Sequence, residues 1–336
     1  MSEIPQARFL ELLQDIEPSA TTNKNASEAH TELRDFLKAD PEFSKYHSSD
    51  FLSGSYKRDT AIRPRKKGDQ VDRPDVDIIV ITNHTTDADP KEVVNLLFRT
   101  LKKKYPNIRR QNRSVGIEYY KADMDVVPAI PNGSRLLIPD RDSNTWVTTD
   151  PEKHTSWTAD INQRTEGRFK PLVKLIKWYR RQHPTNSKKP KGLTLECMVA
   201  ECMDYQETDY GELFVKTLEN MVRRYDAIVS IGFVPTIQDP AIPGNSVTDD
   251  IKYEDFREFF HKIKDHAKVG RDALNCTDCD EATGLFREVL GDRFPKTTSN
   301  RAKSTLAEPV VATSATFPNR PIRPNKPTGF ANVVSG

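Results

Sequence analysis

Apolar residues recur at helical spacing in the first part of the chain, and this pattern predicts helices there. The spacing runs through residues 4–16 and again through residues 27–40. Residues 19–25 are polar and read as a break between these two helices. A third amphipathic helix is predicted over residues 90–104, with basic residues at its carboxyl end that suit the helix dipole.

Short apolar runs between the predicted helices indicate strands. The four consecutive β-branched residues from Ile78 to Ile81 are typical of a buried strand. Residues 115–120 predict a second strand, and Asp125 opens a third, which Pro128 closes. Residues 139–156 read as a loop with short strands.

The second half of the chain is helical in pattern. Amphipathic segments follow one another from residue 162 to about residue 295, and the remainder is rich in Pro, Ser, Thr and Asn, as in flexible tails. These patterns indicate an α+β protein in three parts. Residues 1–160 carry the N-terminal helices and the strands, residues 161–295 form a helical lobe, and residues 296–336 form the tail.

Two aspartates begin the first predicted strand. Side chains alternate along a strand, so Asp75 and Asp77 point the same way. Neighbouring carboxylates resist joint ionisation, and a divalent cation such as Mg²⁺ or Mn²⁺ removes that cost. Upstream, Gly54 permits close approach of the backbone to a phosphate, and Ser55 adds a hydroxyl at the predicted start of a helix.

Each of these features also has an ordinary structural interpretation, as a helix cap or a solvated turn. Their order along the chain instead favours metal-dependent phosphoryl or nucleotidyl transfer. Asp125 adds a third carboxylate from a neighbouring strand, and Asp123, on the same face, is its rival. Three carboxylates can hold two metal ions roughly 3.5–4 Å apart.

Three motifs together carry a family resemblance. Gly-Ser-Tyr-Lys-Arg-Asp-Thr at residues 54–60 is followed by Asp-Val-Asp-Ile-Ile-Val at 75–80 and Met-Asp-Val-Val-Pro-Ala-Ile at 124–130. In this order they resemble the polymerase-β-like nucleotidyltransferases, in particular the oligoadenylate synthetase and cyclic GMP-AMP synthase branch. Its bacterial relatives are the cGAS/DncV-like nucleotidyltransferases (CD-NTases) of anti-phage defence. The resemblance implies a bilobal fold, in which a nucleotidyltransferase lobe with a small twisted mixed sheet faces a helical C-terminal lobe.

The same resemblance implies roles for individual residues. Gly54 and Ser55 would grip the β- and γ-phosphates, and Asp125 maps to the family's third carboxylate. In the helical lobe, Lys174 would reach a nucleotide phosphate. Thr194 would approach a base or sugar beside Leu193, which replaces an aromatic residue found in some relatives.

The activity implied by the resemblance is the joining of nucleoside triphosphates into a ring. Asp75 and Asp77 would hold both of two Mg²⁺ or Mn²⁺ ions, and Asp125 would hold the ion that activates the attacking ribose hydroxyl. ATP is the expected substrate, alone or with a second nucleotide, and a cyclic trinucleotide is favoured over a dinucleotide. The product would be a second messenger for a downstream effector in CBASS defence.

Composition narrows the alternatives without removing them. The chain has 336 residues, 51 basic and 49 acidic, so its net charge of +2 gives no strong attraction to nucleic acid. This disfavours a template-independent RNA-end polymerase and an RNA-activated linear oligoadenylate synthetase. An inactive nucleotide sensor is disfavoured by the full set of carboxylates. No apolar run is long enough to span a membrane and no signal-peptide pattern is present, so a cytoplasmic protein is expected.

Two further features remain at the end of the chain. Cys276 and Cys279 form a single C-x-x-C pair, which is a weak zinc signal and reads as incidental thiols. The tail ends in an apolar cluster and Gly336, which a partner's groove could capture. By the family resemblance, an E1/E2-like protein would bind this tail and conjugate Gly336 to a target amine.

Overall fold

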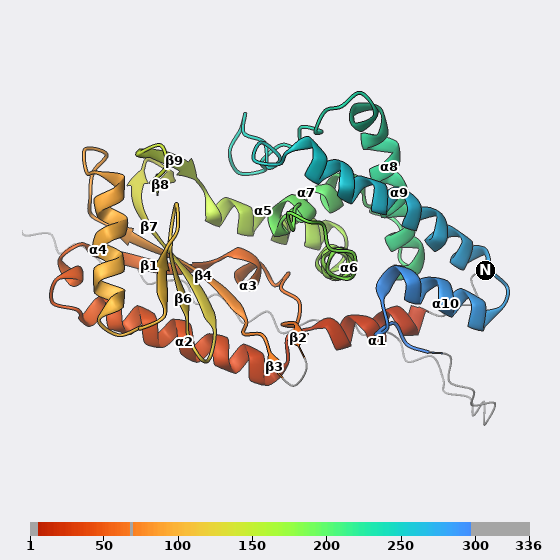
Figure 1. Ribbon diagram of the computed structural model, residues 1–336, viewed down its shortest axis with the longest axis horizontal. Helices are drawn as coiled ribbons and strands as arrows, with labels where there is room; N and C mark the ends of the chain where they lie inside the picture. Colours follow the sequence, from red (N-terminus) through yellow and green to blue (C-terminus); the bar gives the residue numbers. More distant parts are fainter. Residues whose placement is uncertain (1–5, 68–69, 297–336) are drawn as a thin grey trace, which may run out of the picture. The chain divides into compact units, whose positions relative to one another are not determined.

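A computed structural model describes residues 6–67 and 70–296 (Figure 1). The prediction for Gly336 and for the tail lies outside these ranges. The division into lobes at residues 160 and 161 stays a prediction, and this position falls inside a helix, Pro151–Arg164. None of the helices in the described ranges combines the length and apolar character needed to cross a bilayer.

The strands gather in one mixed sheet, apart from a small separate hairpin. The sheet strands are β1 His47–Ser53, β4 Asp75–Thr82, β5 Ile108–Arg110, β6 Val115–Glu118, β7 Asp123–Asn132, β8 Arg135–Asp140 and β9 Thr145–Thr149. The hairpin strands are β2 Lys66–Lys67 and β3 Gln70–Val71.

The first helices alternate with the strands, and the later helices follow one another along the chain. They are α1 Gln6–Ile16, α2 Ala20–Ala39, the 3₁₀ turn η1 Phe43–Lys45, α3 Gly54–Arg58, α4 Pro90–Lys102 and α5 Pro151–Arg164. The remaining helices are α6 Phe169–Gln182, α7 Gly192–Cys202, α8 Tyr210–Ser230, α9 Tyr253–Asn275 and α10 Cys279–Leu290. The α+β class predicted from the sequence is confirmed.

The sheet is ordered β1-β4-β7-β6-β5, with β8 continuing from β7 and β9 pairing with β8. β4 and β7 run parallel, whereas β1, β6 and β8 pair antiparallel with their neighbours. The parallel pairing places Asp77 directly beside Asp125 and Asp75 beside Asp123. The two aspartate motifs, about fifty residues apart in the chain, therefore become neighbours.

The alternation of side chains along β4 places its buried apolar residues and its aspartates on opposite faces of the sheet. Val76 and Ile78 of β4 and Val126 of β7 are buried in the core that α2 and α4 form with the sheet. Because successive side chains point to opposite faces, Asp75 and Asp77 face away from that core.

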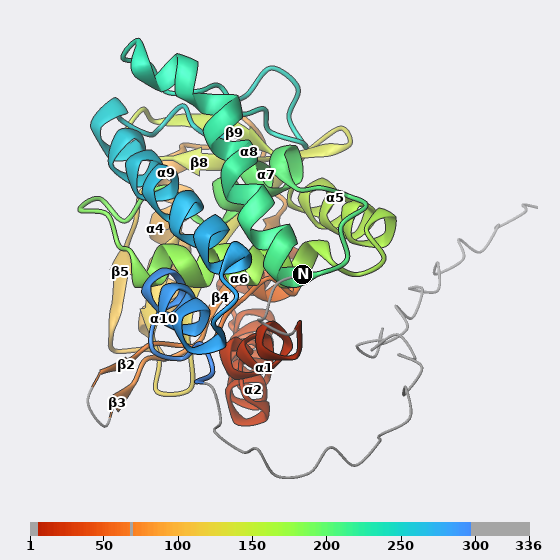
Figure 2. The ribbon, with the colours of Figure 1, turned by 90° about the vertical axis from the view of Figure 1, so that its right-hand side faces the viewer.

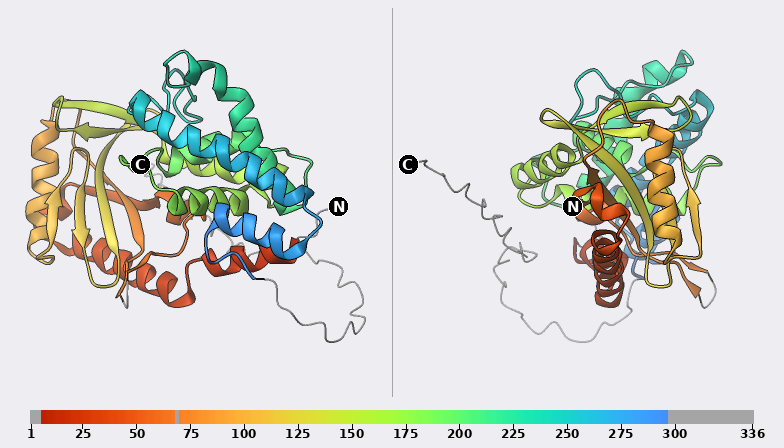
Figure 3. Two further views of the ribbon diagram at one scale, coloured as in Figure 1. Left: turned by 45° about the vertical axis from the view of Figure 1, so that its right-hand side comes forward. Right: turned by 90° about the vertical axis from the view of Figure 1, so that its left-hand side faces the viewer.

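The first two helices belong to different cores. α1 buries Phe9 and Ile16 among the helices of the second half. α2 packs against the sheet instead, and both helices are drawn in red in Figure 3. In Figure 2, α8 and α9 lie side by side within this helical half. The chain therefore ties the sheet to the helical half near its own beginning.

Two local predictions were wrong. Residues 19–25 are not a break, because Ser19 caps α2 by accepting a hydrogen bond from the Thr22 N–H, and the helix starts at Ala20. Residues 151–156 are helical rather than loop, because Asp150 accepts from Lys153 and Pro151 occupies the first turn of α5.

A buried charged network joins the turn after α3 to the helical half. Glu196 of α7 is fully buried and accepts from Arg58 Nε at 2.8 Å, Thr60 Oγ1 at 2.8 Å and Lys177 Nζ at 2.7 Å. Burial opposes ionisation of Glu196, but Lys177 and Arg58 outweigh it and lower its pKa to about 2. Each charge in this network depends on the others for compensation.

Replacing Glu196 by Gln is expected to lower the free energy of unfolding by about 3 kcal/mol, because two buried cations lose their carboxylate. Urea denaturation monitored by far-UV circular dichroism measures this. Glu11→Gln, at an exposed position of α1, is the matched control and should stay within about 0.5 kcal/mol of wild type. If the Glu196 variant were as stable as the control, Arg58 and Lys177 would not depend on Glu196 for charge compensation.

Candidate active site

Four aspartates meet on one face of the sheet at the start of β4 and β7. Asp75 and Asp77 come from β4, and Asp123 and Asp125 lie opposite them on β7. The predicted trio of Asp75, Asp77 and Asp125 is therefore brought together on a single face. In the described part of the chain, no three His, Cys, Asp or Glu side chains converge closely enough, as they lie, to hold one metal ion.

The turn at Gly54 fits against this carboxylate face. Gly54 has a φ of +67°, a conformation that favours glycine. A Cβ atom at this position would overlap the Asp77 carboxylate and lie 2.5 Å from its Cγ. Glycine is therefore required here by contact with Asp77, in addition to the predicted approach of a phosphate. Ser55 follows in the first turn of α3.

The electrostatics of this face favour a cation. Burial, with the charges of Asp77, Asp125 and Asp123, raises the pKa of Asp75 to about 7, although its side chain still reaches solvent. Burial and the charge of Asp125 raise the pKa of Asp77 to about 6. Burial also raises the pKa of Asp125. A divalent cation would offset this crowding of negative charge, and carboxylate oxygens are the ligands that Mg²⁺ and Mn²⁺ prefer.

The two candidate third carboxylates have different partners. Asp123 forms an ion pair with Arg73, with 2.7 Å between Oδ1 and Nε. Asp125 instead accepts a neutral hydrogen bond of 2.8 Å from Gln111 Nε2 and lies beside Asp77. Asp123 is in direct contact with a cation, whereas Asp125 is hydrogen-bonded to a neutral amide and feels Arg109 only through its charge, which favours Asp125 as the third ligand.

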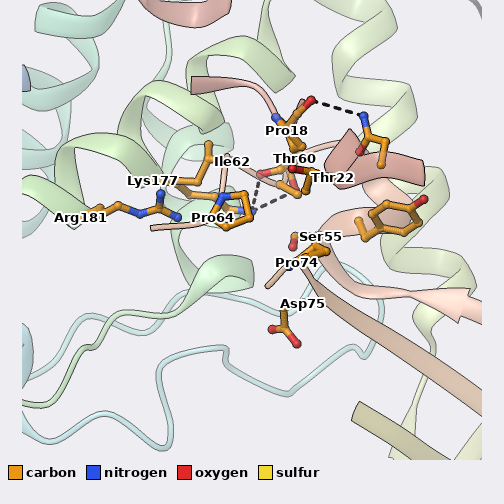
Figure 4. A pocket seen from close by; sticks show the side chains of 13 residues that line it. Pro18, Thr22, Ser55, Thr60, Ile62, Pro64, Pro74, Asp75, Lys177 and Arg181 are labelled. Atoms are coloured by element: carbon orange, nitrogen blue, oxygen red, sulfur yellow. Dashed lines mark hydrogen bonds between the residues drawn. The ribbon is translucent and has the colours of Figure 1, made fainter. Parts of the chain in front are cut away.

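A cavity of about 240 Å³ lies beside Asp75 at the edge of the carboxylate face. Ser55 and Asp75 lie along one part of it, and Lys177 and Arg181 of α6 lie along another (Figure 4). Thr60 lines it as well and accepts a 2.9 Å hydrogen bond from Lys177 Nζ. The cavity thus connects a predicted metal-binding carboxylate with two basic side chains, an arrangement suited to a phosphate chain.

Two predicted nucleotide contacts have other partners in this structure. Lys174 is buried and donates to Glu17 at 2.6 Å and to Asp59 at 3.2 Å. Thr194 donates its hydroxyl hydrogen to the Val247 carbonyl at 3.0 Å. Their roles as nucleotide ligands stay predictions.

Sequence reasoning missed Lys177, Arg181 and Gln111. Lys177 and Arg181 are separated from Lys174 by one and two helical turns, so any basic residue of this helix was an equal candidate from the sequence. Gln111 gave no signal, because its contact with Asp125 depends on the pairing of three strands.

The fold and this face define a polymerase-β-like nucleotidyltransferase. Residues 4–162 match the family described as the Second Messenger Oligonucleotide or Dinucleotide Synthetase domain. The chain is 46% identical over 334 residues to the Cyclic AMP-AMP-AMP synthase of Acinetobacter sp., covering 97% of both chains.

Solved structures agree on the fold. The CD-NTase CdnG of Bradyrhizobium diazoefficiens in complex with GTP aligns with a TM-score of 0.71 at 17% identity, over 87% of this chain and 97% of that one. CdnC of E. coli MS115-1 with ATP aligns with a TM-score of 0.69 at 16% identity, over 87% and 99%. The chain belongs to the bacterial cGAS/DncV-like nucleotidyltransferases, and it is an enzyme that synthesises a cyclic oligonucleotide.

Replacing either Asp77 or Asp125 by Asn is expected to lower the rate of pyrophosphate release about hundredfold or more, because each would remove a charge that stabilises the transition state. Asp123→Asn is the matched control on the same strand face and should cost far less, since Arg73 already neutralises that carboxylate. Melting temperatures should not fall in the Asp77 and Asp125 variants, because each substitution relieves repulsion between carboxylates. An Asp123 variant as damaged as the Asp125 variant would contradict the choice of third ligand.

Proposed function

We propose that this enzyme makes a cyclic trinucleotide of AMP from ATP. The likeness to the Acinetobacter Cyclic AMP-AMP-AMP synthase extends over nearly the whole of both chains, so it includes both the carboxylate face and the helical half. The observation that carries the chemistry is the register of β4 and β7, which sets Asp77 beside Asp125. Asp75, on the same face of β4, lines a cavity together with the basic side chains of Lys177 and Arg181.

The carboxylates of Asp75, Asp77 and Asp125 fit two divalent cations by donor type and by their shared face. Such ions would supply Lewis-acid stabilisation of the phosphate oxygens and a lowered pKa for the attacking hydroxyl. Asp75 and Asp77, adjacent on one strand, would bind both ions. Asp125 would bind the ion on the side of the attacking ribose.

The phosphates of the donor nucleotide would lie along the cavity between Ser55 and α6. Gly54 brings the start of α3 against Asp77, so the Ser55 hydroxyl and backbone N–H stand next to the carboxylate face. Lys177 also lines the cavity and supplies positive charge, and Arg181, one helical turn further along α6, adds to it. Lys177 now donates to Thr60 and Glu196, so binding of a phosphate there would exchange one of these contacts.

Lys174 would act indirectly in this scheme. Its ammonium group binds Asp59, which follows α3 and has a φ of 57°. By holding this left-handed residue, Lys174 would fix the end of the helix that presents Ser55. Thr194 would contribute through the backbone at the start of α7, since its hydroxyl is bound to Val247.

The proposal predicts a defined product. Incubation with labelled ATP and Mg²⁺ or Mn²⁺, followed by phosphatase, should leave one resistant species with the mass of cyclic tri-AMP. The reaction should need no primer, and Asp77→Asn should give no product. Addition of GTP, CTP or UTP should not change the main species.

Other outcomes would identify other enzymes. A resistant product that forms only with GTP would contain GMP in place of AMP at one position of the ring. Phosphatase-sensitive oligomers would indicate a linear oligoadenylate synthetase, and long tails formed only on an RNA primer would indicate a polymerase. Either of the last two results would overturn the proposed cyclisation.

A further inference from the structure

On one face of the sheet, a position without a side chain lies beside the proposed third metal ligand. The register places Asp77, Asp125, Gly116 and Arg109 in one row across β4, β7, β6 and β5. Gly116 has no side chain, so nothing on β6 fills the face between Asp125 and β5. The side chains of Gln111 and Arg109, from the β5 end of the sheet, lie against this space.

Gln111 reaches across the gap to Asp125. Its Nε2 donates to Asp125 Oδ1 at 2.8 Å, and its Oε1 accepts from Ser114 Oγ at 3.1 Å. A carboxylate only accepts and only the NH₂ group of the amide can donate, so the carboxylate fixes which end of the amide faces it. The Ser114 hydroxyl, which can donate, then pairs with the amide oxygen. The Gln111 backbone is held as well, because its N–H donates to the Ser114 carbonyl at 2.9 Å and its carbonyl accepts from Arg141 at 3.1 Å.

Gly116 is necessary for this contact. A Cβ atom there would overlap the Gln111 amide nitrogen and lie 3.1 Å from Asp125 Oδ1 and 3.3 Å from Arg109 Cζ. Any larger residue at position 116 would displace the glutamine or the carboxylate. The backbone of Gly116 shows no left-handed φ, so space is the reason for glycine here.

We propose that Gln111 is a positioning residue that holds one oxygen of Asp125 and leaves the other directed to a catalytic cation, with Gly116 providing the room. This inference rests on the proposed metal-dependent function. Because a hydrogen bond to one carboxylate oxygen restricts rotation of the group, the ligand is pre-oriented before the cation arrives. Such partners of metal ligands typically contribute about 10–100-fold to metal affinity or activity.

The test is a titration of the full-length protein with Mn²⁺ in the absence of nucleotide. The electron paramagnetic resonance signal of free Mn²⁺ measures how much is bound. Gln111→Leu removes the donor at nearly constant size and should raise the dissociation constant about tenfold. Gly116→Ala should act in the same direction by displacing the amide. Ser114→Ala should have a smaller effect, because it only loosens the glutamine.

The kinetic signature should separate positioning from substrate binding. In Gln111→Leu, kcat should fall while KM for ATP stays unchanged, since the proposed phosphate contacts lie on α3 and α6. Gln206→Leu, at an exposed glutamine, is the matched control and should change neither quantity. Melting curves identify any variant that does not fold, and Gly116→Ala and Ser114→Ala then carry the test.

An Asp125→Asn arm separates the two claims. If Asp125→Asn weakens Mn²⁺ binding but folded Gln111→Leu and Gly116→Ala bind like wild type, the role of Gln111 is overturned and the metal site stands. If Asp125→Asn itself binds Mn²⁺ like wild type, the proposed metal site fails first.

Discussion

The parallel pairing of β4 with β7 is the constraint on which the rest of this site depends. It places Asp77 beside Asp125 and Asp75 beside Asp123, and so concentrates negative charge on one face of the sheet. Burial of these groups, together with the charges of neighbouring carboxylates, raises the pKa values of Asp75, Asp77 and Asp125. The surrounding residues must therefore offset this negative charge and orient the carboxylates.

Two nearby cations partly compensate this charge. Burial raises the pKa of Asp77, and the positive charges of Arg58 and Lys177 limit that rise. Both cations are themselves bound by the buried Glu196. Arg58 follows the Gly54 turn, whereas Lys177 and Glu196 belong to the helical half. The negative charge of the carboxylate face is thus partly offset by the same network that holds the end of α3 against α6 and α7, so local stability and the geometry of the proposed site are coupled.

The mixed α+β class could be predicted because strand alternation and helical spacing are local signals. The motif order pointed to the three aspartates, which the register of β4 and β7 brings to one face, and their role as metal ligands stays a prediction. The motif order also indicated Gly54, although the contact of Gly54 with Asp77 requires the folded sheet. Lys177 could not be distinguished from Lys174, since both lie on one basic helix and only tertiary packing pairs Lys174 with Glu17. The roles of Gln111 and Gly116 could not be predicted either, because their contacts with Asp125 exist only in the register of β5, β6 and β7. The start of α2 was misjudged because polar residues within it were read as a break, although Ser19 caps the helix.

Asp75, Asp77 and Asp125 are proposed to bind the catalytic cations together. Anomalous diffraction at the manganese edge, from crystals grown with Mn²⁺ and a non-hydrolysable ATP analogue, can locate these ions. Manganese peaks are expected at Asp75 and Asp77, one of them also bound by the Asp125 oxygen that Gln111 leaves free. Manganese bound through Asp123, or no manganese on this face of the sheet, would overturn the proposed metal site.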